Sequence, residues 1–374
     1  MKIPLFKPNL GEEELSSVKE VFDSGWLGLG PKTAQFEIAI AEYQGRKHAV
    51  AVNSCTAALH LALMALDLPA DAEVLVPTFT FVSTAHAVEY LGLKTVFVDC
   101  QNNLTIDLLD LERKISDKTK VIIPVHIGGE ACQMEEIMSI AAKHNLIVIE
   151  DVANGQGSEY KGKKLGSWGH MACLSFEAKK NITTGDGGMI LFDDDQWYEV
   201  IKRLRWLGIS KDTWQRFADK GGNYSWYYEI NELGYKYNMN DIAAAIGLCQ
   251  LKKLDHFNDT KAKIIARYIE GLTGVGDIKI ADYSLDKSGY WLFMIRTDHR
   301  DELFAYLASQ EITCGVHFMP CHMHPYYSNK YGKLNLINSE SLWQKNISLP
   351  LYTQFTESEQ DYVISKIKEF YQGK

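Results

Sequence analysis

Four kinds of chemically capable residues occur in this sequence, each where an apolar run ends. The stretch SFEAKKNITTGDGG, residues 175–188, carries two adjacent lysines, and a lysine amine can bond covalently to a carbonyl carbon. Asp151 ends the run LIVIED and can face a cation, while Phe81 in TFTFVS can stack on a planar ring. Cys55 and Thr56 open a helical pattern, where unpaired N–H groups and the helix dipole suit a phosphate. Each feature alone is also typical of an ordinary loop, turn, core or helix cap.

The composition is that of an ordinary globular protein, and it excludes several classes of function. A chain of 374 residues is long for one core, so a large domain and a smaller one are expected. The formal charge of -9 argues against a nucleic-acid surface, which needs a concentrated basic footprint. No apolar run approaches the length that spans a bilayer, which predicts a cytoplasmic protein without membrane contact. Seven cysteines without a CxxC pair indicate reduced thiols with structural roles.

The elements that must position these residues alternate between strand and helix patterns from about residue 47 to 193. Helical patterns separate several of the strands, as CTAALHLALMALDL and QMEEIMSIAAKHN do. Strands that are apolar throughout and separated by helices predict a mostly parallel sheet with helices on both faces. This is an α/β domain. The predicted strands are HAVAVN, EVLVPT, KTVFVD, KVIIPVH, LIVIED, ACLSF and GMILFD.

The remainder of the chain predicts a smaller α+β domain. After Asp195 the pattern becomes helical, and beyond Gly274 the strand-like segments YWLFMIRT and ITCGVHF flank a helical DELFAYLASQ. A terminal helix, ESEQDYVISKIKEFY, closes the chain. We therefore place a large domain with an N-terminal arm at residues 1–255, and a small C-terminal α+β domain at 256–374.

The four features of the first paragraph fall at strand ends, where α/β sheets bind their ligands. Pyridoxal 5'-phosphate (PLP) needs all four of them. Its phosphate requires a helix N-terminus, its pyridine nitrogen a carboxylate, its ring a stacking partner and its aldehyde a lysine. The combination therefore predicts a PLP enzyme more strongly than any single motif does.

A series of ordered motifs runs nearly from end to end of the chain: GWLGLGPKTAQFE, NSCTAALHLAL, VPTFTFVST, IPVHIGG, VIEDVANGQGS, YKGKKLGSWG, LSFEAKKNITTGDGG, LGYKYNMNDIAAAIGLCQL and HFMPCHMHPYY. Through these motifs the chain resembles a known family, the DegT/DnrJ/EryC1/StrS sugar aminotransferases. The resemblance implies the aspartate aminotransferase fold, fold type I of the PLP-dependent transferases.

The resemblance assigns roles to individual residues. It implies that Lys180, and not Lys179, is the catalytic lysine that forms a Schiff base with the cofactor. It implies that Asp151 pairs with the pyridine nitrogen and that Phe81 stacks on the ring. Residues that match the family's phosphate contacts are Cys55 (through its backbone N–H), Thr56 and Ser175.

Several positions depart from the family's commoner pattern. Asn154 stands where a Gln or His approaches the ring oxygen of the cofactor, and it keeps hydrogen-bonding capacity with a shorter reach. Asp186 stands where Glu usually precedes Gly-Gly. The family completes each active site with groups from a second subunit of a homodimer, and GYKYNMND matches that region in place of GYNYR. Lys236 and Asn238 are both candidate cross-subunit contacts, Asn238 toward the cofactor and Lys236 toward the substrate.

Two further segments have competing interpretations. The segment HFMPCHMH invites a zinc interpretation, but its spacing matches no standard zinc motif, and the family places it beside the substrate pocket. His317 is therefore predicted to line that pocket, without a metal. An aromatic-rich stretch between residues 206 and 228 can cover a nucleotide base or simply pack a loop; its aromatic residues are Trp206, Trp214, Trp226, Tyr227 and Tyr228.

The activity that these features imply is transfer of an amino group from L-glutamate to a nucleotide-linked keto-deoxysugar. The resemblance favours a dTDP- or GDP-linked 4-keto-6-deoxyhexose, giving a 4-amino sugar for a surface polysaccharide such as lipopolysaccharide O-antigen, or for another glycoconjugate. A 3-keto sugar is the alternative. A related dehydratase carries His in place of the lysine, so Lys180 favours transamination. A non-catalytic regulator would have no need of Lys180 or Asp151.

Overall fold

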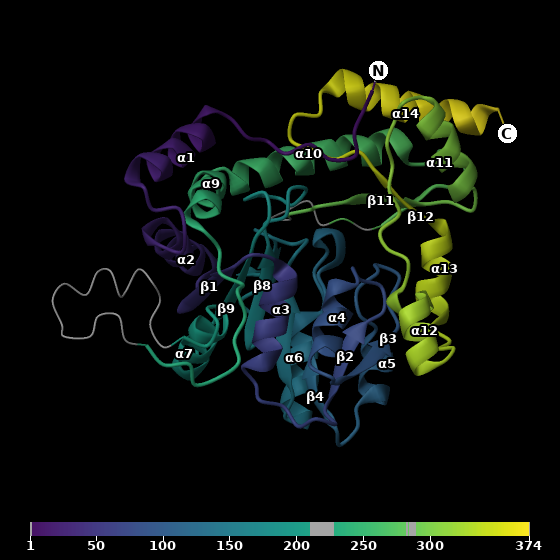
Figure 1. Cartoon of the computed structure of the whole chain (residues 1–374). Coiled ribbons are helices and arrows are strands. Elements are labelled where there is room, and N and C mark those ends of the chain that lie inside the picture. The colour runs from purple at the N-terminus through teal and green to yellow at the C-terminus, as the bar shows by residue number, and fades with distance from the viewer. Residues whose placement is uncertain (1, 210–227, 282, 284–288, 374) are drawn as a thin grey trace.

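The computed structural model describes residues 2–209, 228–281, 283 and 289–373, and its centre is a seven-stranded sheet (Figure 1). The strand order is β1-β9-β8-β5-β4-β2-β3, and β9 alone runs antiparallel to its neighbours. The prediction of a mostly parallel sheet is therefore confirmed. Its strands are β1 (His48–Val52), β2 (Glu73–Pro77), β3 (Lys94–Val98), β4 (Thr119–Ile122), β5 (Ile147–Asp151), β8 (Met171–Ser175) and β9 (Gly188–Phe192).

Helices cover both faces of this sheet, which explains why its strands are apolar throughout. Successive side chains of a strand point to opposite faces. In β1, Val50 and Val52 accordingly pack with α3, α4 and α7, while Ala49 and Ala51 pack with α2 and α9. The described helices of this domain are α1 (Glu12–Ser24), α2 (Pro31–Gln44), α3 (Cys55–Met64), α4 (Ser83–Tyr90), α5 (Leu108–Lys114), α6 (Met134–His144), α7 (Asp195–Leu204) and α9 (Asp241–Leu251).

A second hydrophobic core lies between a small antiparallel sheet and three long helices. The sheet consists of β10 (Lys279–Ile280), β11 (Phe293–Arg296) and β12 (Asn346–Leu349). Helices α10 (Leu254–Leu272), α11 (Arg300–Ser309) and α14 (Glu357–Gln372) pack around it, at the top of Figure 1. This arrangement is the predicted α+β domain.

The N-terminal arm ends in this second core. Ile3 is fully buried there and forms a parallel bridge with Ile312. Helix α10 joins the two parts, since Leu254 packs in the first domain and Tyr268 in the second. The boundary between residues 255 and 256 stays a prediction, and it falls inside the first turns of α10.

One predicted strand is wrong. The segment ITCGVHF, residues 312–318, forms isolated bridges at Ile312 and Gly315 but no ladder, and the place beside β11 is taken by β12. Side-chain bonds hold the segment: Asn346 donates to the carbonyl O of His317 at 3.1 Å. Short connecting elements complete the described chain: β6 (Glu159–Tyr160), β7 (Lys163–Lys164), α12 (Pro325–Tyr331), α13 (Ile337–Lys345) and the 3₁₀ turns η1 (Ile127–Gly129) and η2 (Cys321–Met323). No helix of the described ranges is both long and apolar enough to cross a bilayer.

Candidate active site

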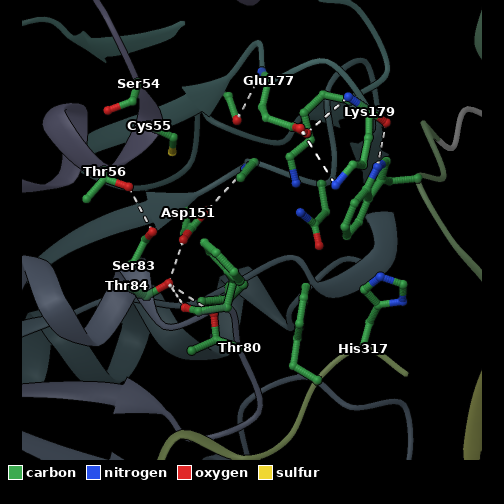
Figure 2. A pocket seen from close by; sticks show the side chains of 18 of the residues that line it. Ser54, Cys55, Thr56, Thr80, Ser83, Thr84, Asp151, Glu177, Lys179 and His317 are labelled. Carbon is green, nitrogen blue, oxygen red and sulfur yellow. Dashed lines mark hydrogen bonds and ion pairs between the residues drawn. The ribbon is translucent and has the colours of Figure 1, made fainter. Parts of the chain in front are cut away.

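A pocket of about 670 Å³ opens where the carboxyl ends of the central strands meet the second domain (Figure 2). Parallel strands bring the residues that follow them to one edge of the sheet, and this edge is where the pocket lies. Every site residue predicted from the sequence lines it except Lys236 and Asn238. Those present are Cys55, Thr56, Phe81, Asp151, Asn154, Ser175, Lys180 and His317, and Asp186 lines it as well.

Lys180 lies in the loop between β8 and β9, and backbone hydrogen bonds fix that loop. Phe176 closes it, because its N–H donates to the carbonyl O of Gly187 at 2.8 Å. The N–H of Lys180 donates to the carbonyl O of Glu177 at 2.9 Å. The Lys179 side chain is 60% exposed, with its Nζ 3.9 Å from the Glu177 carboxylate, whereas Lys180 is half-buried. The two adjacent lysines therefore differ in their surroundings, Lys179 facing solvent and Lys180 being partly buried.

The amine of Lys180 lies against an aromatic face. Its Nζ is 3.6 Å from the ring centroid of Trp291. Burial lowers the pKa of Lys180 to about 8, although Asp151 and the thiol of Cys55 act in the opposite direction. A lysine with a pKa near 8 is substantially neutral under mildly alkaline conditions, and the neutral amine is the form that attacks a carbonyl carbon.

Asp151 presents a buried carboxylate at the end of β5. Its Oδ1 accepts a hydrogen bond from the N–H of Ala153 at 3.0 Å, and its Oδ2 accepts one from the hydroxyl of Thr84 at 2.8 Å. Burial raises the pKa of Asp151, while both bonds and the charge of Lys180 act in the opposite direction. Within the described part of the chain no basic side chain forms an ion pair with it. A buried carboxylate without a cationic partner fits a ligand that brings a protonated nitrogen.

The start of α3 provides an anion site beside these groups. Ser54 is the N-cap, and its Oγ accepts the N–H of Ala57 at 3.1 Å. This cap leaves the N–H groups of Cys55 and Thr56 without partners among the residues described. Gly188 of β9 passes so close that an added Cβ would lie 2.5 Å from the carbonyl of Ser54. A glycine is needed here for the strand to approach the helix start, and the free N–H groups fit a phosphate.

Phe81 and Asn154 contribute a ring and an amide to the pocket. Phe81 is 57% exposed, whereas its neighbour Phe79 is fully buried in a core, so the two aromatic residues of TFTFVS have different roles. The ring of Phe81 lies 5.7 Å from that of Phe318. Asn154 accepts the N–H of Gly128 through Oδ1 at 3.1 Å. This bond leaves the amide NH₂ of Asn154 as a donor for an oxygen of a ligand.

Lys236 and Asn238 lie outside the pocket of their own chain. The Nζ of Lys236 lies 3.0 Å from the ring centroid of Trp206. The amide of Asn238 donates to the carbonyl O of Met239 at 3.0 Å. Their predicted contact with the site of a second subunit stays a prediction. Of the aromatic stretch, Trp206 and Tyr228 are described, and its other aromatic residues lie outside the described residues.

His317 lines the pocket as a neutral imidazole. Its Nδ1 lies 2.9 Å from the hydroxyl of Ser348, and its ring meets the edge of Trp291 at 5.4 Å between centroids. Burial, together with the charges of Lys180 and Lys179, lowers the pKa of His317 to about 4. The imidazole therefore carries no charge at neutral pH and can act as a hydrogen-bonding group in the pocket.

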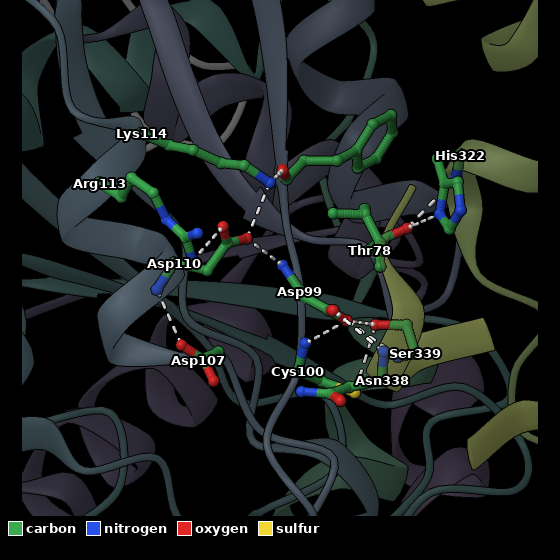
Figure 3. Close-up of polar contacts among 12 residues, drawn as sticks. Thr78, Asp99, Cys100, Asp107, Asp110, Arg113, Lys114, His322, Asn338 and Ser339 are labelled. Carbon is green, nitrogen blue, oxygen red and sulfur yellow. Dashed lines mark hydrogen bonds and ion pairs between the residues drawn. The ribbon is translucent and has the colours of Figure 1, made fainter. Parts of the chain in front are cut away.

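The rest of the histidine-rich segment holds the second domain against the sheet (Figure 3). His322 is 2.7 Å from the Oγ1 of Thr78 and 3.2 Å from the carboxylate of Glu340. Nearby, Asp99 at the end of β3 accepts the N–H of Ser339 in α13 at 2.8 Å, and that of Asn338 at 3.1 Å. No group of three or more potential metal-ligating side chains is arranged to hold an ion within the described ranges.

The sequence did not identify Trp291, Thr84 or Phe318 as site residues. Trp291 and Phe318 come from the second domain and reach the pocket only through the packing of the two domains. Thr84 lies in the motif VPTFTFVST but follows no strand directly, and its hydroxyl reaches Asp151 from the first turn of α4. The position of a Trp one residue after Tyr290, at the start of the predicted strand YWLFMIRT, gave no sign of a role in the site.

Comparisons with known proteins identify the family of the chain. Residues 8–368 match the model of the DegT/DnrJ/EryC1/StrS aminotransferase family. The spore coat polysaccharide biosynthesis protein SpsC of Bacillus subtilis is 38% identical over 99% of this chain and 97% of its own length.

Solved structures share the fold over nearly the whole chain. Spr1654 of Streptococcus pneumoniae, which carries a provisional assignment as a sugar aminotransferase, has a PLP form with a TM-score of 0.92. It is 28% identical, over 100% of this chain and 99% of its own. A pyridoxamine phosphate (PMP) form of the same protein has a TM-score of 0.93. Helicobacter pylori PseC, an aminotransferase of pseudoaminic acid biosynthesis, has a TM-score of 0.93 with 26% identity over the full length of both chains. The chain therefore belongs to the DegT/DnrJ/EryC1/StrS aminotransferase family and is a PLP-dependent sugar aminotransferase.

Proposed function

We propose that this enzyme moves an amino group from L-glutamate to the C4 keto carbon of a nucleotide-linked 6-deoxyhexose, carried on dTDP or GDP. The product, a 4-amino sugar, would be used in a surface polysaccharide or another glycoconjugate, such as an O-antigen. The names of two relatives support this class of product, since SpsC acts in spore coat polysaccharide synthesis and PseC in pseudoaminic acid synthesis.

The observation that carries the proposal is the convergence of Lys180 and Asp151 on one pocket. The side chains come from different loops, yet both line the same cavity, and their charges influence each other's pKa. Bound PLP supplies an electron sink for the amino carbon. Lys180 holds the cofactor covalently and then moves the proton at that carbon. Asp151 keeps the pyridine nitrogen protonated, which preserves the electron sink.

The remaining lining residues are proposed to orient the cofactor. The free N–H groups of Cys55 and Thr56 bind the phosphate together with the hydroxyl of Ser175, at the positive end of α3. Phe81 stacks on the ring, and the NH₂ of Asn154 donates to the ring oxygen. The N–H groups at the start of α3 and the NH₂ of Asn154 are not used by hydrogen bonds among the described residues, so they can bind the cofactor.

The size of the pocket supports a substrate larger than a small keto acid. A volume of about 670 Å³ falls in the middle of the usual range for ligand sites, and holds more than the cofactor. Phe318 and His317 line the side contributed by the second domain. A neutral imidazole beside aromatic rings suits a sugar, whose hydroxyl groups need hydrogen bonds and whose C–H faces pack on rings.

We further propose a homodimer with shared active sites. Large apolar side chains of α1 and α2 are exposed, including Leu15 at 64%, Phe22 at 56% and Ile38 at 59%. A second copy packed by two-fold symmetry would bury such a surface. It would also bring Lys236 and Asn238 toward the partner's pocket, as the family resemblance implies.

Spectroscopy of the two half-reactions tests the proposed substrate. L-Glutamate should convert the bound aldehyde form to the amine form and bleach its long-wavelength absorption. A dTDP- or GDP-linked 4-keto-6-deoxyhexose should then restore the absorption and yield a 4-amino sugar, identified by NMR. Restoration by 3-keto sugars alone would overturn the C4 assignment. Restoration by small keto acids alone would overturn the sugar assignment and leave the cofactor chemistry intact.

A further inference from the structure

We propose that Trp291 is the positioning residue for the free amine of Lys180, which its indole face holds over the pocket whenever the lysine is not bonded to the cofactor. The Nζ of Lys180 lies 3.6 Å from the centroid of the Trp291 ring. A cation this close to an indole face is attracted by the negative potential of the ring. The inference rests on the proposed role of Lys180 and adds a residue from the other domain to its control.

The indole is fixed so firmly that it can serve as a platform. Trp291 is only 4% exposed, and its Nε1–H donates to the carbonyl O of Lys179 at 2.7 Å. The acceptor therefore belongs to the residue directly before the lysine that the ring holds. The backbone N–H of Trp291 donates to the carbonyl O of Gly128 at 2.9 Å. Phe6 of the N-terminal arm stacks on the indole with centroids 5.2 Å apart and planes 6° from parallel.

No other group in the described part of the chain holds the amine directly. Lys180 Nζ forms no hydrogen bond or ion pair with any described residue. The charged or titratable groups that face it act at longer range: Asp151 from β5, Cys55 from α3, Glu177 and Lys179 from its own loop, and His317 from the second domain. Among the described residues, the indole face is thus the one close contact that favours the ammonium form.

Turnover requires the lysine to leave the cofactor and to return. A released lysine side chain has several rotatable bonds, and its ammonium group would otherwise seek water. The indole keeps the amine at the pocket, where it can move a proton at the substrate carbon. It also favours the ammonium over the free amine and so opposes part of the effect of burial, which lowers the pKa of Lys180 to about 8.

The pH dependence of Lys180 acylation in the apoenzyme tests the inference without substrate or cofactor. A small acylating reagent is applied over a pH series, and modified Lys180 is quantified by peptide mass spectrometry. In Trp291→Leu the midpoint should fall by about 0.5 to 1 pH unit, because loss of the π face removes a stabiliser of the ammonium. If Trp291 acted only by excluding water, the midpoint would rise, because water would reach the amine. A rise, or no change, would overturn the inference.

Matched variants separate the ring face from other effects. Trp291→Phe keeps an aromatic face without the N–H donor, so its midpoint should lie between those of wild type and Trp291→Leu. Trp168 is a matched control, because its ring centroid lies 4.8 Å from the Nζ of Lys163 and neither residue lines the pocket. Trp168→Leu should therefore leave the midpoint of Lys180 acylation unchanged. A shift in Trp168→Leu equal to that in Trp291→Leu would contradict a local effect. If Trp291→Leu does not fold, Trp291→Phe and Phe6→Leu replace it in the test. Phe6→Leu removes the ring that stacks on Trp291. In both variants the midpoint of Lys180 acylation should fall.

Kinetics of the purified holoenzyme give a second readout. Trp291→Leu should lower kcat about 3- to 30-fold, the factor that corresponds to a cation–π contact, and should leave KM for L-glutamate nearly unchanged. An increase in KM at constant kcat would show that Trp291 binds substrate and would overturn its positioning role. The labelling result does not depend on which sugar is accepted, so failure of the substrate proposal and failure of this inference remain distinguishable.

Discussion

The hydroxyl of Thr84 donates a hydrogen bond to Oδ2 of Asp151 at 2.8 Å, and so joins the first turn of α4 to the end of β5. Both side chains are almost fully buried, at 1% and 4% exposed. Removal of a donor from a buried carboxylate favours its protonated form. Thr84 therefore helps to keep Asp151 ionised in a site where burial raises its pKa.

We expect Thr84→Val to raise the pKa of Asp151 further, so that the acid limb of the kcat profile moves to higher pH and kcat falls several-fold at neutral pH. Thr84→Ser keeps the hydroxyl and should restore both. The measurement is kcat against pH for the three proteins. Equal acid limbs in wild type and Thr84→Val would show that the hydrogen bond has no influence on the carboxylate.

Asp151→Asn should retain the fold and much of the bound cofactor but lose most of its turnover. An amide cannot keep the pyridine nitrogen protonated, although it is close in size to the carboxylate. Circular dichroism and cofactor content establish that the variant is intact, and steady-state assays measure the loss. Turnover close to wild type would contradict the assigned role of Asp151.

Borohydride reduction of the yellow holoenzyme should leave the cofactor attached to Lys180 and not to Lys179. Lys180 lies against the pocket wall, whereas the side chain of Lys179 is 60% exposed beside Glu177. Peptide mapping locates the label. Lys180→Ala should prevent labelling and Lys179→Ala should not, and a label on Lys179 in the wild-type protein would sink the assignment.

A shared active site predicts complementation between two inactive variants. Lys180→Ala and Asn238→Ala homodimers should each be weak, and mixing them after mild dissociation should form hybrid dimers with one intact site. Partial recovery of activity, at most about half the specific activity of wild type in each hybrid, is the expected result. Matched controls are the two variants mixed without dissociation. An active monomer at assay concentrations would refute shared sites.

Lys261 should destabilise the folded protein more at neutral pH than at pH 10. It is 5% exposed on α10, has no ion-pair or hydrogen-bond partner in the described ranges, and burial lowers its pKa from 10.5 to about 8. Between these values Lys261 binds more protons in the unfolded chain than in the folded one, so its contribution to stability rises with pH, and its full cost is present below pH 8. The shift corresponds to roughly 3 kcal/mol.

Lys261→Met removes this charge at similar side-chain length. Its free energy of unfolding should exceed that of wild type by on the order of 1 to 3 kcal/mol at pH 7, and the difference should shrink toward pH 10. Urea denaturation at both pH values measures it. Lys263→Met, on the exposed face of the same helix, should change stability little at either pH. A constant difference between pH 7 and pH 10 would show that the lysine is not desolvated.

The sequence predicted the central sheet and one side of the pocket, because both follow from local pattern. The apolar strand patterns, and the residues that directly follow them, predicted that Cys55, Asp151 and Lys180 lie at the carboxyl edge of the central sheet. Trp291 was missed, because its position in the site depends on how the second domain packs on the first. The segment 312–318 was given the wrong structure for a related reason: its apolar character is satisfied by the N-terminal arm and by β12 rather than by a ladder of its own.

The N-terminal arm links the fold to the chemistry over a few residues. Ile3 is bridged to Ile312, and Phe6 stacks on Trp291, the residue that lies against Lys180. The arm therefore behaves as a tether between the second domain and the catalytic lysine. We therefore expect affinity tags or fusion partners joined at this arm to disturb the contact between Phe6 and Trp291 more than the same additions after α14. Protein engineering of this enzyme should accordingly treat Leu5 and Phe6, which line the pocket, as part of the active centre and use the other terminus for attachments.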